Sequence, residues 1–179
     1  PIYFLRMRPA NFPTIRLAQL AMLVSRNNRI LDLIKEVETI TQLKKQFSFE
    51  ISEYWNNHYR FDKISIPAEK KLGNTFIDNL IINTFIPILY AYGRTVGSEL
   101  HKQKALRWLS ELQPESNSIL IGFNSLGIKP NSAKESQALL ALHKNYCLEL
   151  KCTECLIGSK ILKDSNLDSF KLSPIIVDV

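Results

Sequence analysis

The sequence predicts an all-α protein, a bundle of about seven helices with a central apolar helix and one long aromatic loop. Apolar residues recur at helical spacing along most of the 179-residue chain. Strand patterns do not alternate with helix patterns, and no internal repeat is found, which disfavours a parallel sheet and a solenoid. With 45% hydrophobic and 22% charged residues, the composition excludes a disordered or fibrous chain.

Three helices are expected in the first part of the chain. Pro13 suits the first position of a helix, and the apolar stripe that follows it extends to Val24. Residues 27–28 are both Asn, which end this helix and can cap a second one over residues 30–37. A third short helix follows Thr39. Residues 48–73 then lose the helical period, so we expect a long packed loop there.

The central helix is expected over residues 74–92, which are apolar nearly all round and so belong in the middle of a bundle. Pro87 removes the hydrogen bond to the carbonyl of Asn83 and predicts a kink. Asp78, Asn79 and Asn83 are expected to organise helix contacts, with a functional pocket as the alternative. The uncharged run 79–93 is too short to cross a bilayer, so no membrane contact is expected.

Further helices are expected over residues 98–112, 117–126, 132–147 and 153–163. The chain is thus predicted to be one helical domain, residues 1–163, followed by a tail, residues 164–179. This tail is expected to be either a short strand or disordered.

The basic charge is concentrated in the first part of the chain. Residues 1–110 hold 16 basic and 9 acidic side chains, whereas residues 111–179 hold 7 and 8. Arg6, Arg8 and Arg16 surround a predicted helix N-terminus, where cations are unfavourable unless an anion is bound. We therefore predict an anion site, with phosphate as a fitting ligand. The alternative is a buried carboxylate clamped by arginine.

A second candidate site is the aromatic and basic stretch over residues 54–63, which includes Trp55, His58, Tyr59 and Arg60. Rings of this kind stack on nucleic-acid bases while cations hold the phosphates. Alternatively, the rings only anchor the loop to the helices.

A third candidate is a metal site. All three cysteines fall within nine positions, and they follow a histidine in the order His143, Cys147, Cys152, Cys155. The C-x2-C spacing suits one metal ion, so a structural zinc site or an iron–sulfur cluster is predicted. Ordinary buried thiols are the alternative. Three cysteines without a secretory leader also predict a cytoplasmic protein.

Four stretches of the chain resemble a bacterial family known only as domain of unknown function 2851: residues 6–21, 54–61, 77–93 and 145–162. The cysteine trio belongs to these stretches, and His143 does not. The family has no established activity, so the resemblance implies no catalytic residue. It does imply a longer protein, with an upstream part similar to restriction-endonuclease-like nucleases.

These observations predict a non-catalytic accessory domain that contacts nucleic acid or another anionic partner within a longer nuclease-like protein. The rival is a structural or protein-interaction module that docks on the upstream part of the same polypeptide or on a second copy. An enzyme that uses His58 with Asp62 or Asp78 is not favoured, because no nucleophile–base pair is recognisable.

Overall fold

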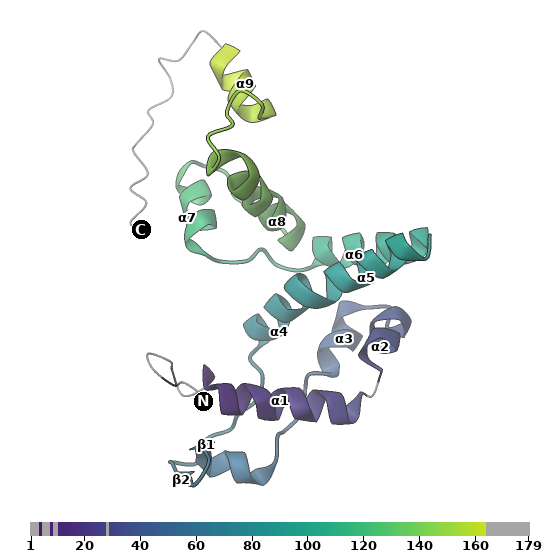
Figure 1. The fold of residues 1–179 in the computed structure, drawn as a ribbon, viewed down its shortest axis with the longest axis vertical. Coiled ribbons are helices and arrows are strands. Elements are labelled where there is room, and N and C mark those ends of the chain that lie inside the picture. The colour runs from purple at the N-terminus through teal and green to yellow at the C-terminus, as the bar shows by residue number, and fades with distance from the viewer. Residues whose placement is uncertain (1–3, 5–7, 9–10, 28, 164–179) are drawn as a thin grey trace. The chain divides into compact units, whose positions relative to one another are not determined.

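The computed structural model describes residues 4, 8, 11–27 and 29–163, and its architecture is helical (Figure 1). The chain divides into unit 1, Pro1–Trp108, and unit 2, Leu109–Val179. The predicted all-α class is confirmed, and within the described ranges the only sheet has two short strands. The predicted tail, residues 164–179, lies outside the described residues.

The helices of unit 1 are α1 (Pro13–Arg26), α2 (Ile30–Glu36), α3 (Ile40–Lys45), α4 (Asn74–Leu80), α5 (Ile86–Thr95) and α6 (Glu99–Glu111), the last of which continues into unit 2. Unit 2 then holds α7 (Ser118–Ser125), α8 (Ala133–Leu142) and α9 (Leu156–Lys163). As predicted, α1 begins at Pro13, where a missing N–H costs nothing. The residue that precedes α2 is Arg29 rather than an asparagine, so the predicted cap at residues 27–28 is wrong for its position.

The segment predicted as a loop contains regular structure. A 3-10 helix, Glu53–Asn57, leads into strand β1 (His58–Arg60), which pairs antiparallel with β2 (Lys63–Ile64). The turn between the strands places Asp62 at a φ of 57°. We name residues 53–64 the aromatic–basic hairpin. The prediction of an irregular loop is wrong here because strands of two and three residues are too short to show alternation.

The central helix is continuous from α4 through a π-helical turn, Ile81–Phe85, into α5. The amide of Ile86 donates to the carbonyl of Ile81, five residues back. This wider turn immediately precedes Pro87, which cannot donate a hydrogen bond of its own. The kink at Pro87 stays a prediction.

Only one face of this helix is buried. Ile81, Ile82 and Leu89 belong to the core, whereas Ile88 and Tyr90 are exposed, so the expectation of burial on every side is wrong. By length and composition alone, the 22-residue helix Asn74–Thr95 could cross a membrane, contrary to the expectation from the shorter uncharged run. The core helix of a soluble protein passes the same test.

Helix α6 holds the end of α2. Lys104 is almost fully buried, and its Nζ donates to the carbonyl of Lys35 at 2.7 Å. Trp108 is completely buried, and its Nε1 donates to the carbonyl of Glu38 at 3.2 Å. Carbonyls at a helix C-terminus lack partners within the helix, so these bonds fix α6 against α2. Burial lowers the pKa of Lys104.

Unit 2 is organised by two capped helices. Asn117 caps α7 by accepting from the amide of Leu120 at 3.0 Å, and Ser132 caps α8 by accepting from the amide of Glu135 at 3.3 Å. Helix α8 continues into a second π turn, His143–Cys147, where the sequence predicted its end. Helix α9 begins at Leu156, three residues later than expected.

Leu89 and Ile88 are neighbours on one helix, but Leu89 is buried and Ile88 is exposed. Substitutions at the two positions test which face of the helix contributes to the stability of unit 1. We expect Leu89→Ala to lower the free energy of unfolding by about 2–5 kcal/mol, because it leaves a cavity in the core. Ile88→Ala, at a side chain that is 44% exposed, should cost less than about 1 kcal/mol. Urea unfolding of the full chain, followed by circular dichroism, measures both, and equal losses would contradict this burial pattern.

Candidate nucleic-acid interface

The two basic motifs predicted as separate sites are brought together in unit 1. The hydroxyl of Thr14, in the first turn of α1, donates to the carbonyl of Tyr59 in β1 at 2.6 Å. The rings of Phe12 and Tyr59 meet edge to face, with 6.2 Å between their centroids. The N-terminus of α1 and the aromatic–basic hairpin therefore form one surface region.

Arg16 is held by neutral groups. Its guanidinium donates to Oδ1 of Asn11 at 2.6 Å and to Oε1 of Gln19 at 2.9 Å, and it lies 3.8 Å from the centroid of the Phe76 ring. Both hydrogen-bond partners are amide oxygens, so these contacts do not form the carboxylate clamp that the sequence offered as an alternative. Partial burial lowers the pKa of Arg16, although a guanidinium stays charged in proteins. We conclude that Arg16 contributes fixed positive charge and packing.

The other two arginines predicted at the anion site differ from Arg16. The structure gives Arg8 an exposed position, where its carbonyl accepts from the amide of Asn11 at 2.8 Å. Arg6 lies outside the described residues.

Arg60 is an exposed cation of the hairpin. Its guanidinium lies 4.2 Å from the ring centroid of Phe4 and 5.2 Å from that of Phe12. Rings on which a guanidinium stacks restrict its position without neutralising its charge. In the part of the chain that the structure describes, no ion pair joins a carboxylate to Arg8, Arg60 or Lys63.

The rings of the hairpin form one cluster. Tyr54 stacks on His58 with 4.0 Å between centroids and 7° between planes, and Trp55 meets Phe61 edge to face at 5.2 Å. The hydroxyl of Tyr54 also accepts from the amide of Asp62 at 3.1 Å, which ties the cluster to the turn. Phe61 is 62% exposed and Tyr54 is 38% exposed. The rings thus pack against one another and still present an open aromatic surface.

His58 has a defined hydrogen position. Its Nδ1 lies 2.7 Å from the carbonyl oxygen of Tyr54 and 2.7 Å from Oδ1 of Asn57. Both partners are acceptors, so Nδ1 carries the hydrogen. This leaves Nε2 as the ring nitrogen without a hydrogen.

Lys70 is a buried cation that the sequence did not indicate. Its Nζ donates to the carbonyls of Asn56 at 2.8 Å and Ala68 at 2.9 Å, and lies 4.1 Å from the centroid of the Tyr59 ring. Gln19 of α1 donates in turn to the carbonyl of Lys70 at 2.9 Å. Burial lowers the pKa of Lys70. Lys70 therefore connects the base of the hairpin to α1.

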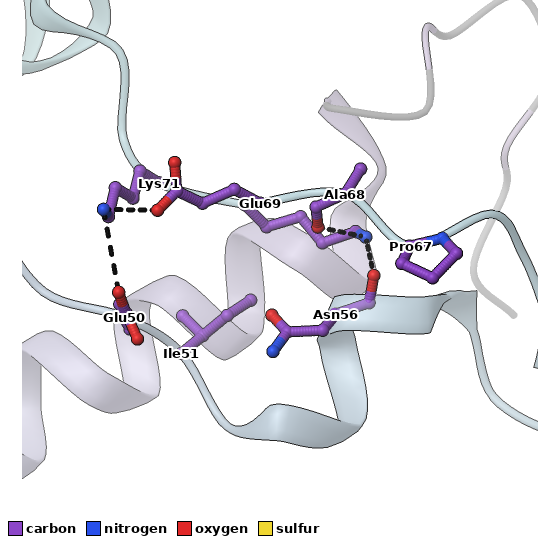
Figure 2. Close-up of a pocket in the computed structure, with 8 residues that line it drawn as sticks. Glu50, Ile51, Asn56, Pro67, Ala68, Glu69 and Lys71 are labelled. Carbon is purple, nitrogen blue, oxygen red and sulfur yellow. Dashed lines mark hydrogen bonds and ion pairs between the residues drawn. The ribbon is translucent and has the colours of Figure 1, made fainter.

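A hollow of about 390 Å³ lies beside the segment that follows the hairpin, and Figure 2 shows its lining. Lys71 lies between two carboxylates there, paired with Glu69 and, at 3.6 Å, with Glu50. These carboxylates offset the lysine charge and would repel a phosphate. The hollow is therefore a poorer anion site than the exposed hairpin.

The polar residues of the central helix have structural partners. Asp78 pairs with Nζ of Lys44 in α3 at 2.5 Å, and the side chain of Asn83 donates to the carbonyl of Asn79 at 3.0 Å. The first contact joins α4 to α3, as the sequence predicts. The second lies within the central helix, where Asn79 and Asn83 are both exposed, so it does not join two helices.

The predicted metal ligands are not assembled as a site. Cys147 and Cys152 are exposed and Cys155 is buried, while Nδ1 of His143 is buried without a hydrogen-bond partner. Among the described residues, no group of three or more His, Cys, Asp or Glu side chains could hold a metal ion as it stands. Burial, followed by the nearby thiols of Cys155 and Cys152, raises the pKa of Cys147, which disfavours the thiolate that a metal needs.

The fold and this surface define a helical protein whose first unit presents clustered aromatic rings beside exposed cations. The chain belongs to the family described as protein of unknown function (DUF2851), whose model matches residues 1–118. This confirms the resemblance, and the match includes all of unit 1, whereas the cysteine segment lies outside the matched residues. No curated protein and no solved structure matches the chain.

Elemental analysis of anaerobically purified protein tests the metal prediction, which stays a prediction from the sequence. If the prediction holds, the protein contains about one zinc ion, or one iron–sulfur cluster, per chain. Cys152→Ser should then lose that metal. Lys160→Gln, a change at an exposed residue of α9, is the matched control and should keep the metal. Only traces of zinc and iron in the unchanged protein would remove the prediction.

Proposed function

We propose that unit 1 binds single-stranded nucleic acid through the aromatic–basic hairpin, as a non-catalytic accessory part of a longer nuclease-like protein. The observation that carries the proposal is the pairing of open rings, Tyr54 and Phe61, with exposed cations, Arg60 and Lys63, on one hairpin. Bases stack on such rings irrespective of sequence, and cations beside them hold the backbone.

A single strand fits this surface better than a duplex. The exposed rings of the hairpin can contact the face of a base only where that face is unstacked, and in a duplex the base faces are covered. Phosphates can be held by Arg60, whose guanidinium is positioned by Phe4 and Phe12. The resemblance described above adds the context of a nuclease-like part elsewhere in a longer chain.

Binding of a fluorescent single-stranded oligonucleotide, followed by anisotropy at several salt concentrations, tests the proposal. We expect Phe61→Ala to weaken binding by about 1–3 kcal/mol, which corresponds to the loss of one stacked base. Arg60→Gln should reduce the dependence of log affinity on log salt by about 0.7, because one fewer counterion is released.

Two changes serve as controls for these variants. Ile66→Ala removes an apolar side chain that is 86% exposed near the hairpin, and Lys129→Gln removes an exposed charge from unit 2. Both should bind like the unchanged protein. Absence of salt-sensitive binding at low ionic strength, or equal losses for Phe61→Ala and Ile66→Ala, would contradict the proposal.

A protein-interaction module is the second candidate, and an exposed apolar stripe on α1 favours it. Leu17, Leu20 and Val24 are 47–55% exposed and recur at helical spacing, so they lie on one face. Scattered apolar side chains are normal on a surface, whereas a continuous stripe often marks a contact.

If the α1 stripe is an interface between two copies, the full chain should elute as a dimer on sizing. Leu20→Lys should then return it to a monomer, because it places a charge in the apolar contact. Leu100→Lys, at a leucine that is 75% exposed on α6, is the matched control and should leave the dimer intact. A monomer at all concentrations would count against self-association through this stripe.

A further inference from the structure

The backbone between α8 and α9 brings the cysteines of unit 2 near one another. The π turn ends at Cys147, and Leu150 then adopts a φ of 53°, the left-handed conformation that commonly ends a helix. The amide of Leu150 donates to the carbonyl of Cys147 at 3.2 Å, and that of Lys151 donates to the carbonyl of Tyr146 at 2.9 Å. These two bonds close the end of the π turn directly before Cys152, and the thiols of Cys152 and Cys155 lie near that of Cys147.

Cys152 and Cys155 lie on a single helical turn. The carbonyl of Lys151 accepts from the amides of Glu154 at 3.2 Å and Cys155 at 3.1 Å. Residues three apart on such a turn face the same side, with Cβ atoms about 5–6 Å apart. A disulfide needs Cβ atoms roughly 3.5–4.5 Å apart, so a small tightening of this turn is enough to join the two sulfurs.

Gly158 allows the backbone of Cys152 to lie close to α9. A Cβ atom on Gly158 would overlap the carbonyl oxygen of Cys152 and would lie 3.0 Å from its Cα. Cys155 is tied to the same helix, because its carbonyl accepts from the amide of Ser159 at 2.7 Å. The first turn of α9 therefore fixes the position of both cysteines, and only glycine allows this approach.

The two thiols differ in exposure. Cys152 is exposed, whereas Cys155 is 9% exposed. We propose that Cys152 and Cys155 form a dithiol site that reacts with small-molecule disulfides of the glutathione type, with Cys152 attacking and Cys155 resolving. A reagent in solution reaches the exposed sulfur of Cys152 first. The buried sulfur of Cys155 is then the neighbour that can attack Cys152 and displace the small thiolate bound there.

The reaction balances as two thiol–disulfide exchanges. The thiolate of Cys152 attacks one sulfur of the reagent, the sulfur–sulfur bond of the reagent breaks, and one small thiolate leaves. The thiolate of Cys155 then attacks Sγ of Cys152 and expels the second small thiolate. The protein loses two electrons and two protons, and the reagent is reduced to two thiols.

Oxidised glutathione added to the reduced full chain, with a chelator present and oxygen excluded, tests the site. Intact mass and peptide mapping should show a loss of two hydrogens and a link between Cys152 and Cys155. In a Cys147→Ser background, Cys155→Ser should stop at a glutathione adduct on Cys152, because no other cysteine thiol is left in the chain to resolve it. Cys152→Ser should form neither the link nor that adduct.

Cys147→Ser is the matched control and should form the same link as the unchanged protein. Gly158→Ala should accumulate the adduct, because its added methyl pushes Cys152 away from α9, and circular dichroism checks that this variant still folds. A link that contains Cys147, or an unchanged protein that stays at the adduct, would overturn the proposal. A protein with both Cys147→Ser and Cys155→Ser that carries no adduct would also overturn it.

Discussion

The candidate interface depends on two buried polar side chains of α1 that donate hydrogen bonds to backbone carbonyls of the hairpin and of the segment that follows it. Thr14 donates to the carbonyl of Tyr59, and Gln19 donates to the carbonyl of Lys70. Buried carbonyls need partners, and a hairpin of so few residues supplies few of its own. Helix α1 supplies them from outside, at sequence separations of 45 and 51 residues. The position of the rings and cations on the surface follows from these bonds.

The sequence predicted most helices because their signals are local. Pro13, Asn117 and Ser132 each stand where a helix begins, and the apolar stripes lie between them. The hairpin was missed because its register is irregular and its strands are very short. Lys70 was missed because, beside Lys71, it has the pattern of a solvated charge, and its burial depends on Tyr59 and Asn56, which are distant in sequence.

The candidate sites were predicted in part. The arginine motif and the aromatic motif were identified separately, and their contact through Thr14 depends on tertiary packing that periodicity does not encode. Arg16 shows the same limit, since a charge at a helix N-terminus does not reveal that amide oxygens and Phe76 surround it. The cysteine spacing was visible, whereas the unequal exposure of Cys152 and Cys155 was not. The aromatic–basic hairpin and the cysteines lie in different units.

The π turn at Ile81–Phe85 also sets how unit 1 tolerates changes in chain length. One residue of a regular helix accounts for about 100° of rotation. A π turn already holds one residue more than an α turn, so deleting a residue within Ile81–Phe85 would leave Leu89 and Gly93 near the faces they now occupy. Deleting one from α5 before Leu89 would instead rotate both residues by about 100°. Gly93 cannot move freely, because a Cβ there would already lie 2.9 Å from the backbone nitrogen of Lys102 in α6. We therefore expect a change of chain length within α5 before Gly93 to disturb unit 1 more than a substitution on the exposed side of this helix.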